Sequence, residues 1–298
     1  MSLPRIVLPG KTYMLTRRCF GRHFFLRPSR QINRVVKFCL AVSAERFGCQ
    51  VHAFCFLSNH FHMIVTDEGG RVPEFMHWFN EFVAKCINAE LGRWESFWAP
   101  GSYSRVELLD RGKLVDGLVY VFVNPVDAGL VPTHTQWPGA NSLPADTAGR
   151  TEIVKRPEGF FRSDGTVPET ATLRVVPPAV LEQEGPGWCE ALAKRVAARE
   201  SQIRRRLREK GKSFLGRRQV LKQSPFGVPR GVAPRRGLNP RVGAVDKWRR
   251  LEALDRLKSF IEDYRRAWFD YSSGELLAVF PEGTYWLRVR FGVQCAGP

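Results

Sequence analysis

Two runs rich in aromatic and β-branched residues, CQVHAFCFL (49–57) and HFHMIVT (60–66), flank the dipeptide Ser58-Asn59. This pattern predicts two strands joined by a tight turn. Side chains at i and i+2 of a strand point to the same face, so His60 and His62 share one face and the residue between them points to the other. The hairpin therefore presents two imidazoles side by side on one face of a sheet.

Four further segments place this hairpin in a larger sheet. Residues 11–20 and 104–109 predict strands, and residues 31–48 and 73–91 carry apolar residues at helical spacing. The second helix opens on Pro73, a favourable residue in a first helical turn. The order strand, helix, strand, strand, helix, strand predicts an α+β fold, with a ferredoxin-like antiparallel sheet and helices on one face.

Residues 110–123, DRGKLVDGLVYVFV, fit two kinds of element. Their β-branched content favours a strand, whereas Asp110 as an N-cap and Pro125 as a stop favour a helix. The choice matters because, in a helix, Tyr120 and Asn124 lie four residues apart on one face.

Beyond residue 142 the composition changes twice. Residues 143–190 are rich in Pro, Gly, Thr and Glu without periodicity, which indicates a linker or loosely structured insert. Residues 191–298 begin with an arginine-rich helical pattern, and a second helical pattern follows a Pro/Gly/Arg-rich stretch. We therefore expect a compact domain over 1–142, then the linker or insert, then a basic and mostly helical C-terminal region.

The net charge of +17 is concentrated in one segment. Residues 194–250 contain 19 Lys and Arg against 3 Asp and Glu, a local charge of +16. An arginine-rich block without an apolar anchor is typical of nucleic-acid binding rather than membrane binding; a solvated basic face is the alternative. The residues expected to contact DNA are Arg204, Arg205, Arg206, Arg208, Arg217, Arg218, Arg235 and Arg236.

The remaining composition predicts a cytoplasmic protein without a membrane partner. The sequence contains no run of eighteen apolar residues and no cleavable leader pattern. Its seven cysteines are scattered, odd in number and form no C-x-x-C pair. We expect them to be reduced core residues rather than disulfides or a zinc site.

The histidine pair supplies two of the ligands that a divalent-metal site needs. Alone it is a weak signal, because H-x-H also occurs at polar strand edges and among satisfied core histidines. If residues 110–123 are helical, Asn124 can supply a third ligand and the phenol of Tyr120 can reach a phosphate held at the metal. The alternative is that Asn124 and the proline after it mark a turn, with Tyr120 an ordinary core aromatic.

Several motifs together resemble those of one enzyme family. HAFCFLSNHFHMIV, FWAPGSYSRV, LVYVFVNPVDAGLV and WPGANS resemble, in that order and spacing, the REP-associated tyrosine transposases. These are insertion-sequence-200/605-like enzymes, the single-tyrosine branch of the HUH nucleases, and the resemblance covers about residues 1–142. It implies the ferredoxin-like fold, a helix over 110–123, and DNA transposition by cleavage and rejoining of single-stranded DNA through a 5′-phosphotyrosine.

The resemblance also assigns roles to residues. By match to the family motifs, His60 and His62 are the metal ligands, Tyr120 is the nucleophile, and Asn124 is the polar residue one turn on, which we expect to complete the metal site. It implies Mg²⁺ or Mn²⁺ as the cofactor and single-stranded DNA, with hairpin or inverted-repeat ends, as the partner. The sequence leaves open whether the protein is a monomer or a homodimer.

Departures from the family pattern include Ser58, where proline is frequent, and Asp127, where basic residues are common. Three other functions stay open. The chain could be a replication initiator or relaxase, although those enzymes usually differ in the order of tyrosine and histidines or carry paired tyrosines. It could be a domesticated DNA-binding protein that has lost cleavage. Finally, it could be a structural or RNA-binding protein that uses the basic block alone.

Overall fold

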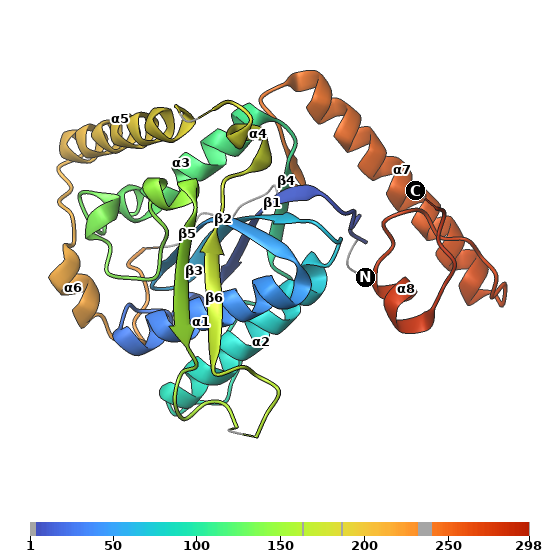
Figure 1. Ribbon diagram of the computed structural model, residues 1–298, viewed down its shortest axis with the longest axis horizontal. Helices are drawn as coiled ribbons and strands as arrows, with labels where there is room; N and C mark the ends of the chain where they lie inside the picture. The colour runs from blue at the N-terminus through green and yellow to red at the C-terminus, as the bar shows by residue number, and fades with distance from the viewer. Residues whose placement is uncertain (1–3, 163, 186, 232–239, 298) are drawn as a thin grey trace.

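The computed structural model describes residues 4–162, 164–185, 187–231 and 240–297, and Figure 1 shows their arrangement. In chain order, the elements are β1 (Lys11–Arg18), the 3-10 helix η1 (Phe20–Arg22), α1 (Arg30–Phe47), β2 (Cys49–Leu57), β3 (His60–Asp67), α2 (Val72–Glu90), β4 (Ser104–Leu108), α3 (Arg111–Asp127), the 3-10 helices η2 (His134–Gln136) and η3 (Pro144–Ala148), β5 (Arg150–Lys155), β6 (Thr170–Val175), α4 (Ala179–Glu182), α5 (Trp188–Glu209), α6 (Arg217–Lys222), β7 (Val242–Gly243), α7 (Lys247–Ser272) and α8 (Trp286–Phe291).

These strands form one sheet in the order β5-β6-β2-β3-β1-β4-β7. Its four central strands, β2-β3-β1-β4, pair antiparallel throughout. The predicted α+β class, with a ferredoxin-like antiparallel sheet, is confirmed. β6 extends the sheet beyond β2, and β7 extends it beyond β4, each through a short parallel pairing.

The two faces of the sheet belong to two separate cores. Phe61 and Met63 of β3 pack into the core formed with α1 and α2, whereas Ile64 packs into the core formed with α3 and α5. In Figure 1, α1 and α2 lie on one side of the sheet and α3 and α5 on the other. The expectation that the helices at 31–48 and 73–91 lie on one face is confirmed for α1 and α2, and α3, which was not part of that expectation, covers the other face. The physical reason is that α3 has its own buried apolar residues, such as Leu118 and Val121, which the second face of the sheet covers.

The segment that fitted either a strand or a helix forms α3. The Asp110 carboxylate caps it by accepting a hydrogen bond from the backbone N–H of Lys113 at 2.7 Å, and its second oxygen accepts from the backbone N–H of the distant Val245, also at 2.7 Å. The helix continues through Pro125 and ends at Asp127, so Asn-Pro is not a turn in this chain. Burial of its valines against the sheet outweighs their preference for strands.

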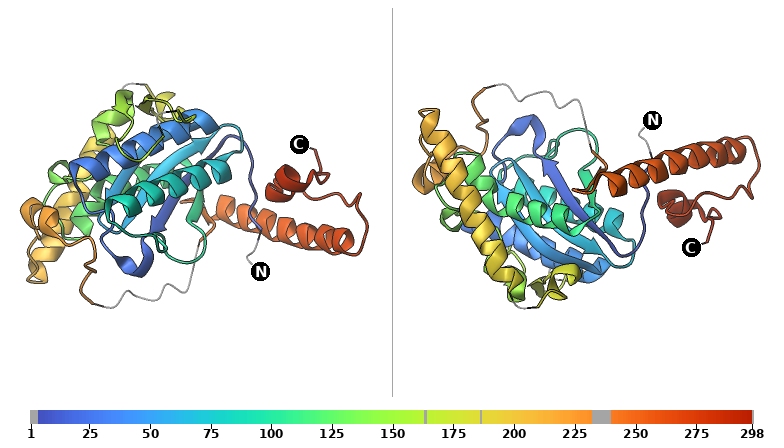
Figure 2. Two further views of the ribbon diagram at one scale, coloured as in Figure 1. Left: turned by 90° about the horizontal axis from the view of Figure 1, so that it is seen from below. Right: turned by 90° about the horizontal axis from the view of Figure 1, so that it is seen from above.

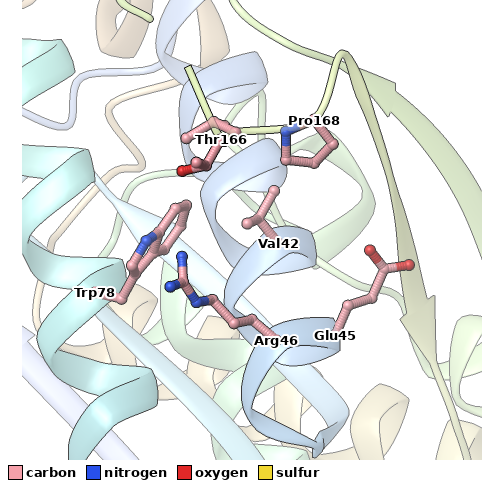
Figure 3. Close-up of a pocket in the computed structure, with 7 residues that line it drawn as sticks. Val42, Glu45, Arg46, Trp78, Thr166 and Pro168 are labelled. Carbon is pink, nitrogen blue, oxygen red and sulfur yellow. The ribbon is translucent and has the colours of Figure 1, made fainter.

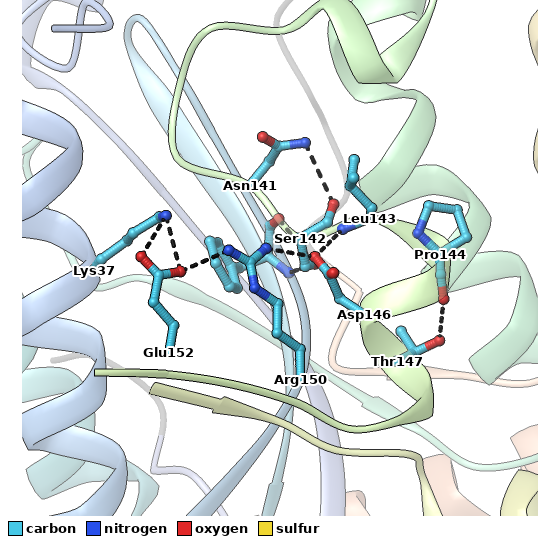
Figure 4. A network of polar contacts seen from close by, with 10 residues as sticks. Lys37, Asn141, Ser142, Leu143, Pro144, Asp146, Thr147, Arg150 and Glu152 are labelled. Atoms are coloured by element: carbon cyan, nitrogen blue, oxygen red, sulfur yellow. Dashed lines mark hydrogen bonds and ion pairs between the residues drawn. The ribbon is translucent and has the colours of Figure 1, made fainter. Parts of the chain in front are cut away.

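Residues 143–190, expected to be a linker or loosely structured insert, instead contribute two strands to the sheet. β5 and β6 pair antiparallel along their length, and Val154 and Leu173 are buried in the core beside α1. In Figure 4 the Glu152 carboxylate accepts hydrogen bonds from Lys37 of α1 at 2.9 Å and from Arg150 at 2.8 Å. These contacts fix the segment to the main body, and the linker interpretation is corrected accordingly.

The C-terminal region is mostly helical where it is described, but its first long helix is not a separate unit. Leu192, Val196 and Ile203 of α5 are buried against α3. α7 differs, because it projects from the rest of the molecule as an arm (Figure 2). Along this arm, Ala267 packs against Phe280 in a small core of its own.

The described helices include none that is long and apolar enough to cross a membrane. All seven cysteines are free thiols; five are buried as expected, whereas Cys189 and Cys295 are only half-buried. Burial raises the pKa of Cys19 and of Cys55 well above the usual range, so these thiols stay protonated and unreactive.

One buried histidine outside the candidate site makes stability depend on pH. His52 on β2 is fully buried; its Nδ1–H donates to the Val176 carbonyl at 2.9 Å, and the Thr66 hydroxyl lies 2.7 Å from its Nε2. Burial lowers the pKa of His52 to about 4. In the unfolded chain the imidazole takes up a proton near its ordinary pKa of ~6.5, whereas the folded protein resists protonation until about pH 4.

We therefore expect the free energy of unfolding to fall as the pH drops from about 6.5 to about 4, with about 3 kcal/mol of the loss due to His52. Urea unfolding of the wild type and of His52→Gln at pH 7 and pH 4.5 measures this contribution. The variant lacks the titrating ring, so its stability should change less between the two pH values. Equal pH dependence of the two proteins would contradict the assignment to His52.

Candidate active site

The histidine pair lies on the face of the sheet that α3 covers. Arg18 of β1 and Leu57 of β2 lie opposite His60 in the strand register, and Thr16 of β1 lies opposite His62. The two imidazole centroids are 5.0 Å apart and their planes are nearly perpendicular. Strand alternation thus brings both rings together, as the sequence predicted.

Each histidine has a polar partner at its Nδ1 atom. The Asn59 Oδ1 lies 2.7 Å from Nδ1 of His60, and the Thr16 hydroxyl lies 2.7 Å from Nδ1 of His62. Because the Asn59 amide oxygen only accepts hydrogen bonds, Nδ1 of His60 carries the proton and its lone pair is on Nε2. The same tautomer of His62 is compatible with its threonine partner. This arrangement is typical of histidines that bind a metal through Nε2.

Tyr120 reaches the histidine pair from α3. Its hydroxyl oxygen lies 3.4 Å from Nε2 of His62, and the two rings meet edge to face with centroids 4.9 Å apart. The side chain keeps 36% of its surface exposed, although its neighbours Val121 and Phe122 are buried. Tyr120 is therefore partly exposed to solvent while its hydroxyl lies against the imidazole pair.

Asn124 lies one helical turn beyond Tyr120 and is almost fully buried, with 6% of its surface exposed. Its Oδ1 atom accepts no hydrogen bond from the described residues. A buried amide oxygen without a donor is costly unless a ligand or water satisfies it. This orphaned oxygen, on the same helix face as Tyr120, has the chemistry of a ligand for a hard or borderline divalent ion.

The donors present fit a divalent metal of mixed nitrogen and oxygen preference. Over the described ranges, no three His, Cys, Asp or Glu side chains are grouped to hold a metal ion. A metal at this position would have the two imidazoles as its nitrogen donors, and oxygen donors would have to come from elsewhere, as ions such as Mn²⁺ accept.

The arginines expected to contact DNA fall into different environments. In α5, Arg206 pairs with Asp127 at 2.8 Å, and Arg204 donates to the Pro132 carbonyl at 3.1 Å. These contacts hold α5 against the end of α3. The ion pair with Arg206 also gives Asp127 a structural role.

The other predicted arginines have looser surroundings. Arg205 is exposed and 4.0 Å from Glu209 of its own helix, and Arg208 is exposed near the end of the same helix. Arg217 and Arg218 are exposed at the start of α6. Arg235 and Arg236 lie outside the described residues.

Sequence reasoning did not give Thr16 or Asn59 a role in orienting the histidines. Thr16 is 46 residues from His62 in the chain, and only the pairing of β1 with β3 brings them together. Asn59 was visible beside the first histidine, but its place next to the turn made a turn function equally consistent.

A hollow of about 470 Å³ lies elsewhere, between α1, α2 and the loop that joins β5 to β6 (Figure 3). Val42 and Trp78, which line it, belong to the core on the α1–α2 side of the sheet. The hollow is thus on the face opposite the histidines and takes no part in the candidate site.

No family model matches the chain, and no curated protein does. Among solved structures, the chain is similar to a REP-associated tyrosine transposase bound to a REP hairpin, with 17% identity, a TM-score of 0.42 and coverage of 57% of this chain and 97% of that one. It is also similar to a candidate transposase from Deinococcus radiodurans R1, with 18% identity, a TM-score of 0.29 and coverage of 36% and 85%.

Proposed function

We propose that this protein cleaves and rejoins single-stranded DNA in the manner of a tyrosine transposase, with Tyr120 as the nucleophile and a divalent ion, Mn²⁺ or Mg²⁺, held by His60, His62 and Asn124. The observation that supports this most directly is the 3.4 Å approach of the Tyr120 hydroxyl to Nε2 of His62. It brings the hydroxyl of a partly exposed tyrosine to the atoms best suited to hold a metal.

The chemistry assigned to the chain's residues is an in-line displacement. The phenol oxygen of Tyr120 attacks the phosphorus, a new P–O bond to tyrosine forms, and the bond to the 3′ oxygen breaks. The phenol loses a proton and the departing 3′ oxygen gains one. A metal ion at the histidines would neutralise phosphate charge and orient the scissile group.

Rejoining runs the same displacement in reverse. The phosphotyrosine keeps the energy of the broken diester, so a free 3′ hydroxyl can displace Tyr120 without a nucleotide cofactor. Asn59 holds His60 in the Nδ1–H tautomer in both directions, and Thr16 keeps the Nδ1 side of His62 hydrogen-bonded, so both Nε2 atoms stay turned away from these partners.

Covalent capture tests this proposal. Single-stranded oligonucleotides from the DNA that flanks the gene, chosen for inverted repeats and labelled at either end, are incubated with the protein and Mn²⁺, Mg²⁺ or EDTA. We expect a denaturation-resistant protein–DNA band that needs the metal and carries the fragment on the 3′ side of the cut. The same oligonucleotides annealed to their complements serve as the duplex control.

The assay also separates the proposed enzyme from a DNA-binding protein that has lost cleavage. Such a protein would shift the oligonucleotides in a native gel and give no covalent band with any substrate or metal. That result would contradict the proposed function.

A further inference from the structure

Two stretches of the chain carry many cations and no carboxylates. Residues 1–44 contain no Asp or Glu, and neither do residues 210–245. The first stretch contains Arg5, Lys11, Arg17, Arg18, Arg22, Arg27, Arg30, Arg34 and Lys37. The second contains Lys210, Lys212, Arg217, Arg218, Lys222, Arg230, Arg235, Arg236 and Arg241.

The structure brings these two stretches together at the hairpin end of the sheet. The Arg22 guanidinium donates to the carbonyls of Pro229 and Gly231 at 3.0 and 2.9 Å. The backbone N–H of Phe24 donates to the Gly227 carbonyl at 3.0 Å. Segment 221–231 therefore packs across the loop between β1 and α1. Both segments contribute cations to the surface that they form together.

This surface begins next to the histidine pair. The Asn59 side chain, whose Oδ1 accepts from His60, donates through Nδ2 to the Arg22 carbonyl at 3.2 Å. Arg18 is exposed and lies opposite His60 in the register of β1 and β3. On the other side of the turn, the Ser58 hydroxyl donates to Gln223 at 2.8 Å.

Three aromatic side chains are exposed around the same loop. Phe20 has 43% of its surface exposed, Trp94 has 87% and Phe226 has 57%. The backbone N–H of Phe20 donates to the Phe97 carbonyl at 2.8 Å, which places the loop that carries Trp94 beside Phe20. Exposed rings of this size on a strongly basic surface indicate an interaction site.

Buried Phe25 connects the parts of this surface. The Arg93 guanidinium lies 4.1 Å from its ring centre, and the Phe226 ring meets it edge to face with centroids 6.3 Å apart. Glu95 is an acidic neighbour on the same loop, and its carboxylate lies 3.3 Å from Arg93. Glu95 thus neutralises Arg93, whereas the cations of residues 1–44 and 210–245 have no carboxylate within their own segments.

We infer that Phe20, Trp94 and Phe226, with Arg18, Lys222 and Arg230 around them, form a stacking surface for the single strand that flanks the scissile phosphate. This inference rests on the proposed function, because it places the flanking strand beside the Tyr120–His60–His62 site. Aromatic rings stack on bases of any sequence, and the surrounding cations contact the phosphates between them. Paired bases of a duplex are already stacked on one another, so the occupant is single-stranded DNA.

Equilibrium binding without metal tests the inference independently of cleavage. Fluorescence anisotropy of a labelled oligothymidylate in EDTA compares the wild type with Phe20→Ala, Trp94→Ala and Phe226→Ala. We expect each substitution to weaken single-strand binding by about 5- to 150-fold, with an unchanged slope of affinity against salt because no phosphate contact is lost. Affinity for a duplex of equal length should change less than about twofold.

Matched controls come from the α7 arm, where Trp248 is 75% exposed and Phe269 is 69% exposed. Trp248→Ala and Phe269→Ala should leave single-strand binding unchanged. Because Trp94 is 87% exposed, its substitution removes almost no packing and keeps the test valid if another variant unfolds.

The inference would be overturned by unchanged binding in all three variants, by equal loss for duplex and single strand, or by equal loss in the α7 controls. An effect on oligouridylate RNA alone would also overturn it, because the surface would then serve RNA. Failure of the covalent assay with aromatic-dependent binding intact would reject the proposed function and leave the stacking surface standing. A covalent adduct together with binding that does not depend on the three aromatic residues would reject only the stacking surface.

Discussion

The Tyr120→Phe variant is expected to bind single-stranded DNA with nearly unchanged affinity and to form no covalent adduct. The substitution removes the attacking oxygen, while the ring keeps its edge-to-face contact with His62 at 4.9 Å. Phenylalanine has no oxygen that can attack the phosphorus, so adduct formation should fall by at least about 10³-fold. Denaturing gels of the labelled oligonucleotide measure the adduct, and anisotropy measures the binding.

Tyr103 offers the matched control for this experiment. The Arg5 guanidinium lies over its ring at 4.7 Å, and burial raises the pKa of its phenol, which makes it a poor nucleophile. Tyr103→Phe should therefore form the adduct as the wild type does. An adduct that survives in Tyr120→Phe and disappears in Tyr103→Phe would place the nucleophile at Tyr103.

Removing either histidine is expected to abolish metal-dependent cleavage. His60→Ala and His62→Ala each take away one of two nitrogen donors, and water is a weaker ligand than imidazole for ions such as Mn²⁺. We expect at least about 10³-fold less adduct. Titration calorimetry with Mn²⁺ gives a second readout that does not depend on turnover, and it should show lost or greatly weakened binding.

Substitutions of the residues around the two histidines are expected to weaken metal binding less than loss of a histidine. Thr16→Ala and Asn59→Ala leave both imidazoles in place but remove their Nδ1 partners, and a loss of about 10- to 100-fold in metal affinity is expected. Asn124→Ala should weaken metal binding without eliminating activity, since water can replace an oxygen ligand.

His77 is a control because its side chain is 68% exposed on α2, and His77→Ala should leave metal binding and adduct formation unchanged. Equal loss in His77→Ala would argue against a metal site at the histidine pair.

Local sequence patterns predicted the antiparallel sheet at the centre of the fold and the shared face of His60 and His62. Alternation in the hairpin fixed the faces of His60 and Phe61, and the strand and helix order gave the antiparallel sheet. For α3, the cap at Asp110 was visible in the sequence, but periodicity alone could not choose between helix and strand. Packing of its apolar residues on the sheet decided the matter.

What the sequence did not predict depends on contacts between distant segments. β5 is rich in charged residues, and its exposed Ile153 has 73% of its surface open, so its pattern lacks the apolar alternation of a typical strand. Pairing with β6 and the ion pairs of Glu152 stabilise it instead. Likewise, the sequence predicts a DNA contact for Arg206, and only the packing of α5 on α3 shows that this side chain pairs with Asp127.

The alternation of β3 between two cores limits how the histidine site can be redesigned or transplanted. A single inserted or deleted residue before His60 would turn both imidazoles into the layer occupied by Phe75 and Phe79, and would turn a phenylalanine ring toward Tyr120. Changes of two residues preserve the assignment of faces. The pair can therefore be grafted onto another sheet, or moved along this one, only in steps of two residues.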